Sequence, residues 1–276
     1  MKILRVFIRK TSQTPTDDYV RIGLPDLFMP KDIDEVHIST IFTWDKEEAI
    51  RLQKNYSQYY PKVFVGGPAF TDGSYDPKFV SGRYVKKGIT ITTRGCNFNC
   101  PWCLVPKYEG RFKEINIESG NTIQDNNILL ASKDHLGKVF QMLRTQKGIR
   151  FLGGLDKRLL KDWHIEELRS LKIKELWLAF DSWDNKIDFI KIMEKLKKAG
   201  FNRNQIRCYV LVGFNEPIQA GEERLRFVYD CGALPYAQNY QPVNEKKRFA
   251  GENSREDNLF IRRWSRPAII KSINEL

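Results

Sequence analysis

The sequence predicts an α/β protein in which a small α/β unit precedes a partial barrel of six strands. Short β-branched runs alternate with segments of helical period along most of the chain, and residues 67–88 are rich in Gly, Pro, Asp and Ser. Strands separated by helices pair in parallel through right-handed crossovers, which favours an open sheet or a barrel. We expect a front domain over 1–86, a barrel over 87–243 and a basic extension over 244–276.

The front domain alternates strand and helix patterns. Residues 2–8, 35–43 and 62–68 are strand candidates, and the last of them ends in a Gly-Gly turn. Between the second and the third, residues 44–60 carry apolar side chains at helical spacing. This order predicts a small α/β unit.

The barrel segment repeats the same alternation. The expected strands lie at 88–95, 121–132, 148–154, 174–182, 205–214 and 235–243, and the expected helices lie at 133–146, 156–171, 185–200 and 223–233. Parallel α/β architectures place their sites at the carboxyl edge of the strands, so residues just past each strand are the first site candidates. They are Cys96, Asp125, Asn126, Asp156, Asp181, Ser182, Gly213 and Gln241.

The composition is that of a globular protein with an excess of basic residues. The 276 residues include 46 Lys and Arg against 34 Asp and Glu, a formal charge of +12. Such an excess attracts polyanions, so nucleic acid or a phosphorylated substrate is a candidate partner, and a merely basic surface is the alternative. There is no secretory pattern at the start and no apolar run of membrane-spanning length, so we expect a cytoplasmic protein without a membrane partner.

Three of the five cysteines stand close together. Cys96, Cys100 and Cys103 follow a strand candidate in C-x3-C-x2-C spacing, and no histidine is near them in the sequence. A closed structural zinc site needs four protein ligands, whereas an iron–sulfur cluster held by three cysteines leaves one iron open to a chelating ligand. The spacing favours the cluster, and zinc or buried thiols are the alternative. Cys208 and Cys231 lie in strand and helix patterns and are interpreted as buried small hydrophobes.

The segment CNFNCPWC, residues 96–103, preceded by TTRG, resembles the cluster motif of the radical S-adenosylmethionine superfamily, including the aromatic Trp102 before the last cysteine. The resemblance implies the partial (β/α)6 TIM-like barrel of that family over residues 88–243. It also implies a [4Fe-4S] cluster whose open iron binds the amino and carboxylate groups of S-adenosylmethionine. An electron from the cluster then cleaves the sulfonium to methionine and a 5′-deoxyadenosyl radical. An electron donor such as flavodoxin or ferredoxin is therefore an expected partner.

The resemblance also implies cofactor contacts at the strand ends, in addition to Trp102. The family's Gly-Gly-Glu is replaced here by QDNN, so that Gln124, Asp125 and Asn126 are candidates for the methionine ammonium, with a turn or helix cap as the alternative. Arg158 is a candidate clamp for a carboxylate, or it covers a helix start. The remaining candidates are Asp181 and Ser182 for the ribose hydroxyls or the carboxylate, and Gly213 and Gln241 beside the adenine.

The segment VFVGGPAF, residues 63–70, resembles the last strand and turn of the cobalamin-binding domain that precedes many enzymes of this superfamily. The Asp-x-His-x-x-Gly motif of that domain is absent, and His37 is interpreted as a structural histidine. We therefore expect a truncated, Rossmann-like relic that binds no cobalamin. The first 95 residues also lack cysteine, which argues against a methylthiotransferase with a second cluster.

The basic extension interleaves arginines with aromatic residues. Phosphate contacts with base stacking on Trp264 would form a nucleic-acid platform. We favour the alternative for the aromatics, which is a solvated helix that docks on the barrel. The expected docking points are Phe260, Ile261, Trp264 and Ile269.

Together these patterns predict a radical S-adenosylmethionine enzyme that abstracts a hydrogen atom from an unactivated C–H bond. The net charge favours nucleic acid or a nucleotide as substrate, and a peptide or small metabolite is the alternative. A non-catalytic zinc or nucleic-acid binding protein is the competing function. The sequence carries no signal for the oligomeric state.

Overall fold

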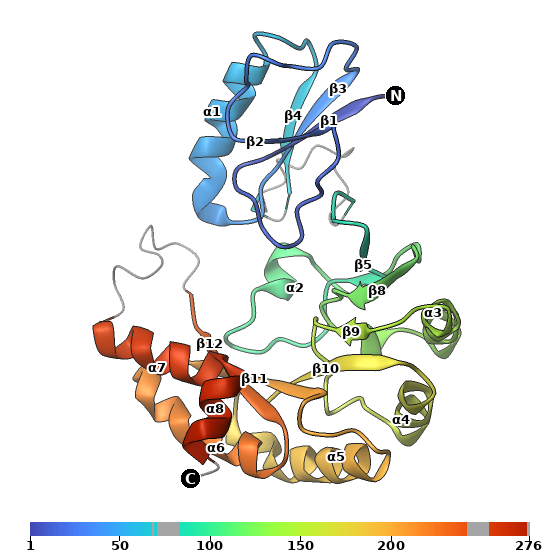
Figure 1. Cartoon of the computed structure of the whole chain (residues 1–276), viewed down its shortest axis with the longest axis vertical. Coiled ribbons are helices and arrows are strands. Elements are labelled where there is room, and N and C mark those ends of the chain that lie inside the picture. The colour runs from blue at the N-terminus through green and yellow to red at the C-terminus, as the bar shows by residue number, and fades with distance from the viewer. Residues whose placement is uncertain (68, 71–82, 242–253, 275–276) are drawn as a thin grey trace. The chain divides into compact units, whose positions relative to one another are not determined.

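The structure is a computed structural model that describes residues 1–67, 69–70, 83–241 and 254–274 (Figure 1). Most of the segment 67–88, the run EKKR and Phe249 lie outside the described residues. The chain divides into two units. The first comprises Met1–Ile89 and Leu104–Gly110, and the second Thr90–Cys103 and Arg111–Leu276. Each unit contains a sheet of parallel strands with helices, which confirms the predicted α/β class.

The first unit is built on a four-stranded parallel sheet in the order β2-β1-β3-β4. Its elements are β1 Ile3–Phe7, β2 Val20–Ile22, β3 Glu35–Ser39, η1 Thr43–Asp45, α1 Lys46–Tyr56, β4 Val63–Gly66 and α2 Val105–Tyr108. Leu52 and Tyr56 of α1 belong to the same buried cluster as Val36 and Ile38 of β3. The edge strand β2 was not predicted, because three residues are too few to show an alternation.

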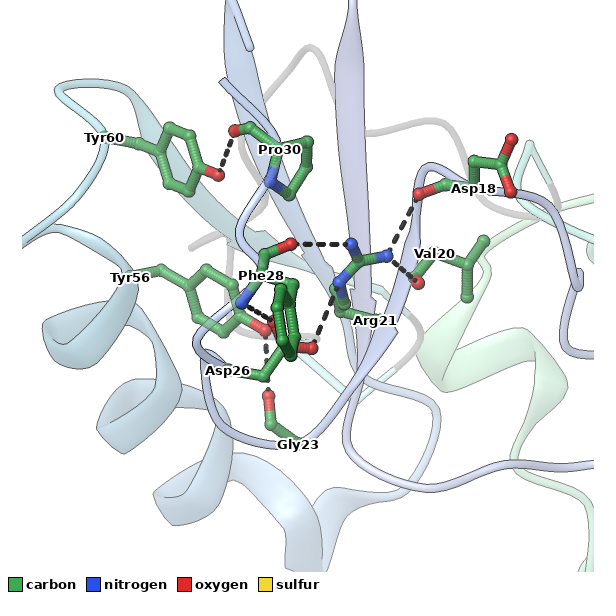
Figure 2. Close-up of polar contacts among 9 residues, drawn as sticks. All are labelled: Asp18, Val20, Arg21, Gly23, Asp26, Phe28, Pro30, Tyr56 and Tyr60. Carbon is green, nitrogen blue, oxygen red and sulfur yellow. Dashed lines mark hydrogen bonds and ion pairs between the residues drawn. The ribbon is translucent and has the colours of Figure 1, made fainter. Parts of the chain in front are cut away.

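The loop that follows β2 is ordered by side chains rather than by regular structure (Figure 2). The guanidinium of Arg21 donates to the carbonyl of Phe28 at 3.3 Å and lies 3.5 Å from the carboxylate of Asp26. From α1 and the turn after it, the hydroxyls of Tyr56 and Tyr60 donate to two further loop carbonyls at 3.1 and 2.6 Å. These bonds satisfy loop carbonyls that no strand partner reaches.

His37 lies in the interior of this unit. Its Nε2 is 3.0 Å from a carboxylate oxygen of Glu35, and its Nδ1 is 2.7 Å from the hydroxyl of Tyr84. Both ring nitrogens are therefore engaged within the unit. This agrees with the interpretation of His37 as a structural histidine.

The second unit is built on a six-stranded sheet in the order β12-β11-β10-β9-β8-β5, of which the edge strand β5 begins with the last two residues of the first unit's segment Met1–Ile89. Its strands are β5 Gly88–Thr90, β8 Gly120–Ile123, β9 Ile149–Phe151, β10 Ile173–Ala179, β11 Ile206–Val212 and β12 Leu234–Asn239, beside the antiparallel pair β6 Thr93–Arg94 and β7 Lys113–Glu114. Strands β8 to β12 pair in parallel with their chain neighbours, and β5 and β12 form the two open edges. This arrangement is an open, barrel-like sheet.

The helices of the second unit cover one side of this sheet (Figure 1). They are η2 Ile128–Leu130, α3 Lys133–Arg144, α4 Asp162–Arg169, η3 Trp183–Asn185, α5 Lys186–Lys198, η4 Ile218–Gly221 and α6 Glu222–Asp230. Leu176, Leu178, Cys208 and Val210 are buried in alternation along β10 and β11, as a sheet with one helix-covered face requires. No helix in the described part of the chain has the length and apolar character needed to cross a membrane.

The extension ends in two helices, α7 Arg255–Ser265 and α8 Pro267–Asn274, that belong to the second unit. Phe260 and Trp264 are buried in its core, which confirms the docking of these aromatics. Trp264 is fully buried, so its ring is not free to stack on a base. In α8 the buried residue is Ile270 and not the predicted Ile269, because the helix turns the next position toward the core.

His164, in the first turn of α4, is expected to make the protein sensitive to acid. The buried ring accepts the backbone N–H of Lys161 through Nδ1 at 2.9 Å, and burial together with Lys161 lowers the pKa of His164 to about 4. The stabilisation from the neutral ring is present above the unfolded pKa of about 6.5 and is lost as the pH falls toward 4. We expect a loss of about 2 kcal/mol between about pH 7.5 and about pH 5.

Urea unfolding at the two pH values measures this loss. The matched control is His164→Asn, which removes the titrating ring and leaves His37 and His135 in place. An equal pH dependence in the two proteins would show that the acid sensitivity arises elsewhere.

Candidate metal and cofactor site

The three cysteines lie on the loop that follows β6. All three are half-buried thiols outside any disulfide, and the backbone N–H of Cys103 donates to the carbonyl of Cys100 at 2.9 Å. The backbone N–H of Phe112 donates to the side-chain oxygen of Asn97 at 3.2 Å, which ties the loop to the segment before β7. No three His, Cys, Asp or Glu side chains among the described residues gather closely enough to hold one metal ion. The three cysteines are thus not brought together as ligands of one ion, and their predicted role as cluster ligands, which would bind three different irons, stays a prediction.

Asp125, at the end of β8, anchors the strand that leads into this loop. Its Oδ1 accepts the backbone N–H of Thr92 at 2.6 Å and that of Thr93 at 3.1 Å, and its Oδ2 accepts the Thr92 hydroxyl at 2.6 Å. Burial raises the pKa of Asp125, although these donors act in the opposite direction. A Cβ on Gly153 would lie 1.7 Å from the Asp125 carbonyl oxygen, so only glycine fits at position 153. Both carboxylate oxygens are thus occupied, and the predicted contact to the methionine ammonium stays a prediction.

The residues immediately before and after Asp125 also form hydrogen bonds: Gln124 bonds to β5, and Asn126 bonds to the segment before the first cysteine. The side-chain oxygen of Asn126 accepts the backbone N–H of Gly95 at 3.0 Å, immediately before the first cysteine. Gln124 donates its backbone N–H to Thr90 at 3.0 Å, and its side-chain oxygen is buried without a partner among the described residues. Buried acceptors are normally satisfied, so Gln124 has capacity for an incoming donor.

Asn127, the fourth residue of QDNN, was not a predicted contact. Its Nδ2 donates to Asp156 at 3.2 Å and lies 4.0 Å from the sulfur of Cys96. Its Oδ1 is buried, and no donor within the described part of the chain forms a hydrogen bond with it. The signal that could have identified it is its place one residue beyond three predicted contacts.

Arg158 joins the loop after β9 to the cysteine loop. Its Nε and Nη2 donate to the two carboxylate oxygens of Asp156 at 2.8 and 2.6 Å, and its side chain also interacts electrostatically with Cys100. The guanidinium carbon lies 3.9 Å from the centre of the Phe98 ring. Burial acts to raise the pKa of Asp156, but the bonds from Arg158 outweigh it and the pKa is lowered. The guanidinium of Arg158 therefore binds a carboxylate of the chain itself, Asp156, in the way predicted for a carboxylate of the cofactor.

Trp102 and Asp181 connect the cysteine loop to the ends of β10 and β11. The Trp102 side chain interacts electrostatically with Asp181, whose Oδ1 accepts the backbone N–H of Leu211 at 2.9 Å. Burial raises the pKa of this carboxyl group. The Trp102 ring meets the edge of Phe214 at 5.9 Å between centroids, and Phe214 packs on Tyr240 at 4.9 Å. Phe214 and Tyr240 were not predicted; each lies within two residues of a strand end, which is the signal that could have identified them.

The three remaining predicted contacts lie near this group but are engaged differently. The Ser182 hydroxyl donates to Asp184 at 2.7 Å and accepts its backbone N–H, which makes it the N-cap of η3. Gly213 has φ +80°, and a Cβ there would lie 3.1 Å from Ile218. Gln241 is exposed. Their contacts with a cofactor stay predictions.

Comparison with known proteins identifies structural but not sequence relatives: no family model and no curated protein matches the chain. The radical S-adenosylmethionine methyltransferase TsrM from Kitasatospora setae, with cobalamin and a [4Fe-4S] cluster bound, is similar with a TM-score of 0.59 and 11% identity over 87% of this chain and 75% of that chain. The same enzyme with its tryptophan substrate and the S-adenosylmethionine analogue aza-SAM bound is similar with a TM-score of 0.54 and 10% identity over 77% of this chain and 63% of that chain. Coproporphyrinogen III oxidase from Escherichia coli aligns with a TM-score of 0.38 and 13% identity over 56% of this chain and 40% of that chain.

At these identities the likeness to TsrM concerns the fold. An alignment over 87% of the chain extends beyond either unit alone, so it includes parts of both. The solved TsrM structures hold a [4Fe-4S] cluster and an analogue of S-adenosylmethionine. The chain thus has the fold of the radical S-adenosylmethionine enzymes, as its three-cysteine segment predicted.

Proposed function

We propose that this protein is a radical S-adenosylmethionine enzyme that holds a [4Fe-4S] cluster on Cys96, Cys100 and Cys103. The observation that carries the proposal is the anchoring of the cysteine loop at the carboxyl ends of successive strands. Side chains that follow β8 hydrogen-bond the loop or the strand that leads into it, Arg158 after β9 lies over Phe98 of the loop, and Asp181 after β10 interacts electrostatically with Trp102. The loop is thereby placed where parallel α/β folds hold their ligands.

When bound, the cluster would supply the electron that divides S-adenosylmethionine into methionine and a 5′-deoxyadenosyl radical. The chain's own residues would bind and orient the cofactor. We assign the unpaired oxygens of Gln124 and Asn127 to the methionine ammonium. We assign Trp102, Phe214 and Tyr240 to the apolar faces of the adenine.

Asp125, Arg158 and Asp181 take positioning roles in this proposal, since their polar atoms already bind other parts of the chain. The reaction that we propose is hydrogen-atom abstraction without cobalamin, because the Asp-x-His-x-x-Gly motif is absent. The substrate class that the charge of +12 favours is nucleic acid or a nucleotide, with a peptide or small metabolite as the alternative.

Methyl transfer is the second candidate. TsrM is a methyltransferase, and its likeness to this chain extends over parts of both units. This reaction would move a methyl group from S-adenosylmethionine and leave S-adenosylhomocysteine. The two candidates therefore differ in the product derived from the cofactor.

The test is anaerobic purification, reconstitution with iron and sulfide, and incubation with S-adenosylmethionine and dithionite. We expect the broad visible absorption of a cluster and release of 5′-deoxyadenosine that requires the reductant. A protein that binds a single zinc ion, or that carries a cluster but leaves the cofactor intact, would contradict the proposal. Formation of S-adenosylhomocysteine together with a bound corrinoid would favour methyl transfer. For the substrate, a steep loss of RNA or DNA affinity with added salt is expected if nucleic acid binds.

A further inference from the structure

Two of the three cysteines are contacted by donors that share one carboxylate. Asn127 approaches Cys96 and donates to Asp156 from the same Nδ2. Arg158 donates to Asp156 from two nitrogens, interacts electrostatically with Cys100 and lies over the ring of Phe98 in the same loop. Asp156 is therefore the common support of a cation and an amide, each directed at a different cysteine of the loop.

This support is rigid. Besides the two side-chain bonds from Arg158, Asp156 accepts the backbone N–H of that same residue at 3.1 Å. The carboxylate side chain is only 11% exposed, and the face of the guanidinium rests on the Phe98 ring. A bidentate, charge-assisted pair fixes orientation as well as distance, so Arg158 has little freedom to leave Cys100.

We propose that the group formed by Asn127, Asp156 and Arg158 sets the reduction potential of the cluster. The inference rests on the proposed function, because it requires a cluster on the three cysteines. Reduction adds one negative charge to a cluster whose thiolate ligands share it. Donors and a positive charge at the sulfurs stabilise the reduced form more than the oxidised form, and so they raise the potential.

The expected size follows from the strength of one such contact. An interaction with a charged group is stronger than one between neutral groups, but only the difference between the two redox states affects the potential. We therefore expect loss of the Arg158 contact to lower the equilibrium constant for reduction about tenfold, which corresponds to about 59 mV for a one-electron couple. Loss of the longer Asn127 contact should act in the same direction by less.

The experiment is a redox titration of the reconstituted full chain without S-adenosylmethionine, followed by the electron paramagnetic resonance signal of the reduced cluster. The variants are Arg158→Gln, Arg158→Lys and Asn127→Ala. Arg158→Lys keeps the charge but loses the planar fork, so its potential should lie between those of wild type and Arg158→Gln. The control is Arg144→Gln, which removes one positive charge from an arginine paired with Glu167 in the helical layer.

A potential that is unchanged in Arg158→Gln, or lowered equally in Arg144→Gln, overturns the inference. If Arg158→Gln takes up no iron, the potentials of Arg158→Lys and Asn127→Ala test the inference in its place. Wild-type potentials in both variants would overturn the inference. Failure of the proposed function is distinguishable, because wild-type protein would then form no cluster or leave S-adenosylmethionine intact.

Discussion

Cys100→Ser is expected to abolish cluster binding and the release of 5′-deoxyadenosine. A serine hydroxyl does not ionise near neutral pH and is a poor ligand for iron beside thiolates, so the loop would offer two sulfur ligands in place of three. Because even the loss of a residue that supports a metal ligand costs about ten- to a hundredfold, we expect loss of a ligand to lower activity by more than about a hundredfold. Iron content per chain and quantification of 5′-deoxyadenosine measure the effect.

Cys231→Ser is the matched control. Cys231 is a half-buried free cysteine beyond the end of α6, away from the cysteine loop in sequence, and serine differs from it by the same single atom. This variant should retain iron and activity. If Cys100→Ser still released 5′-deoxyadenosine at the rate of the control, the three-cysteine site would be refuted.

The architecture of the second unit was predictable because its strands are long and well delimited. Strands β10 and β11 are each seven residues long and rich in aliphatic and aromatic side chains, and each is followed by a helical period. The edge strand β2 has three residues, and its place beside β1 depends on pairing that no local pattern encodes. Length and periodicity therefore separate what was predicted from what was missed.

The site was predictable in location but not in detail. The carboxyl ends of parallel strands indicated Asp125 and Asp181 correctly as residues of this edge. A carboxylate there can bind either a ligand or the backbone of a neighbouring loop, and the sequence alone does not distinguish the two. The hydrogen-bond partners of these carboxylates, Thr92 and Leu211, are distant along the chain. Asn127 and Phe214 were missed for the same reason, since their roles arise from contacts formed only on folding.

Asp125→Ala is expected to destabilise the protein even before any cofactor binds. The substitution leaves the backbone N–H groups of Thr92 and Thr93 and the Thr92 hydroxyl buried without their acceptor. Each unsatisfied buried group costs about 1 to 3 kcal/mol, so we expect a loss of about 3 kcal/mol or more in the free energy of unfolding. Urea unfolding of the iron-free protein at neutral pH measures it.

The iron-free protein decides between the two roles that are open to Asp125. As an anchor, Asp125 stabilises the loop whether or not a cluster is present, and the alanine variant should be both less stable and poor at taking up iron. As a cofactor contact alone, Asp125 would leave the iron-free stability unchanged and would affect only the affinity for S-adenosylmethionine. Asp125→Asn retains one side-chain oxygen to accept from Thr92 and Thr93, so it should fall between wild type and alanine. Equal stability of wild type and Asp125→Ala would remove the anchoring role, and with it the explanation of how the end of β8 holds the cysteine loop.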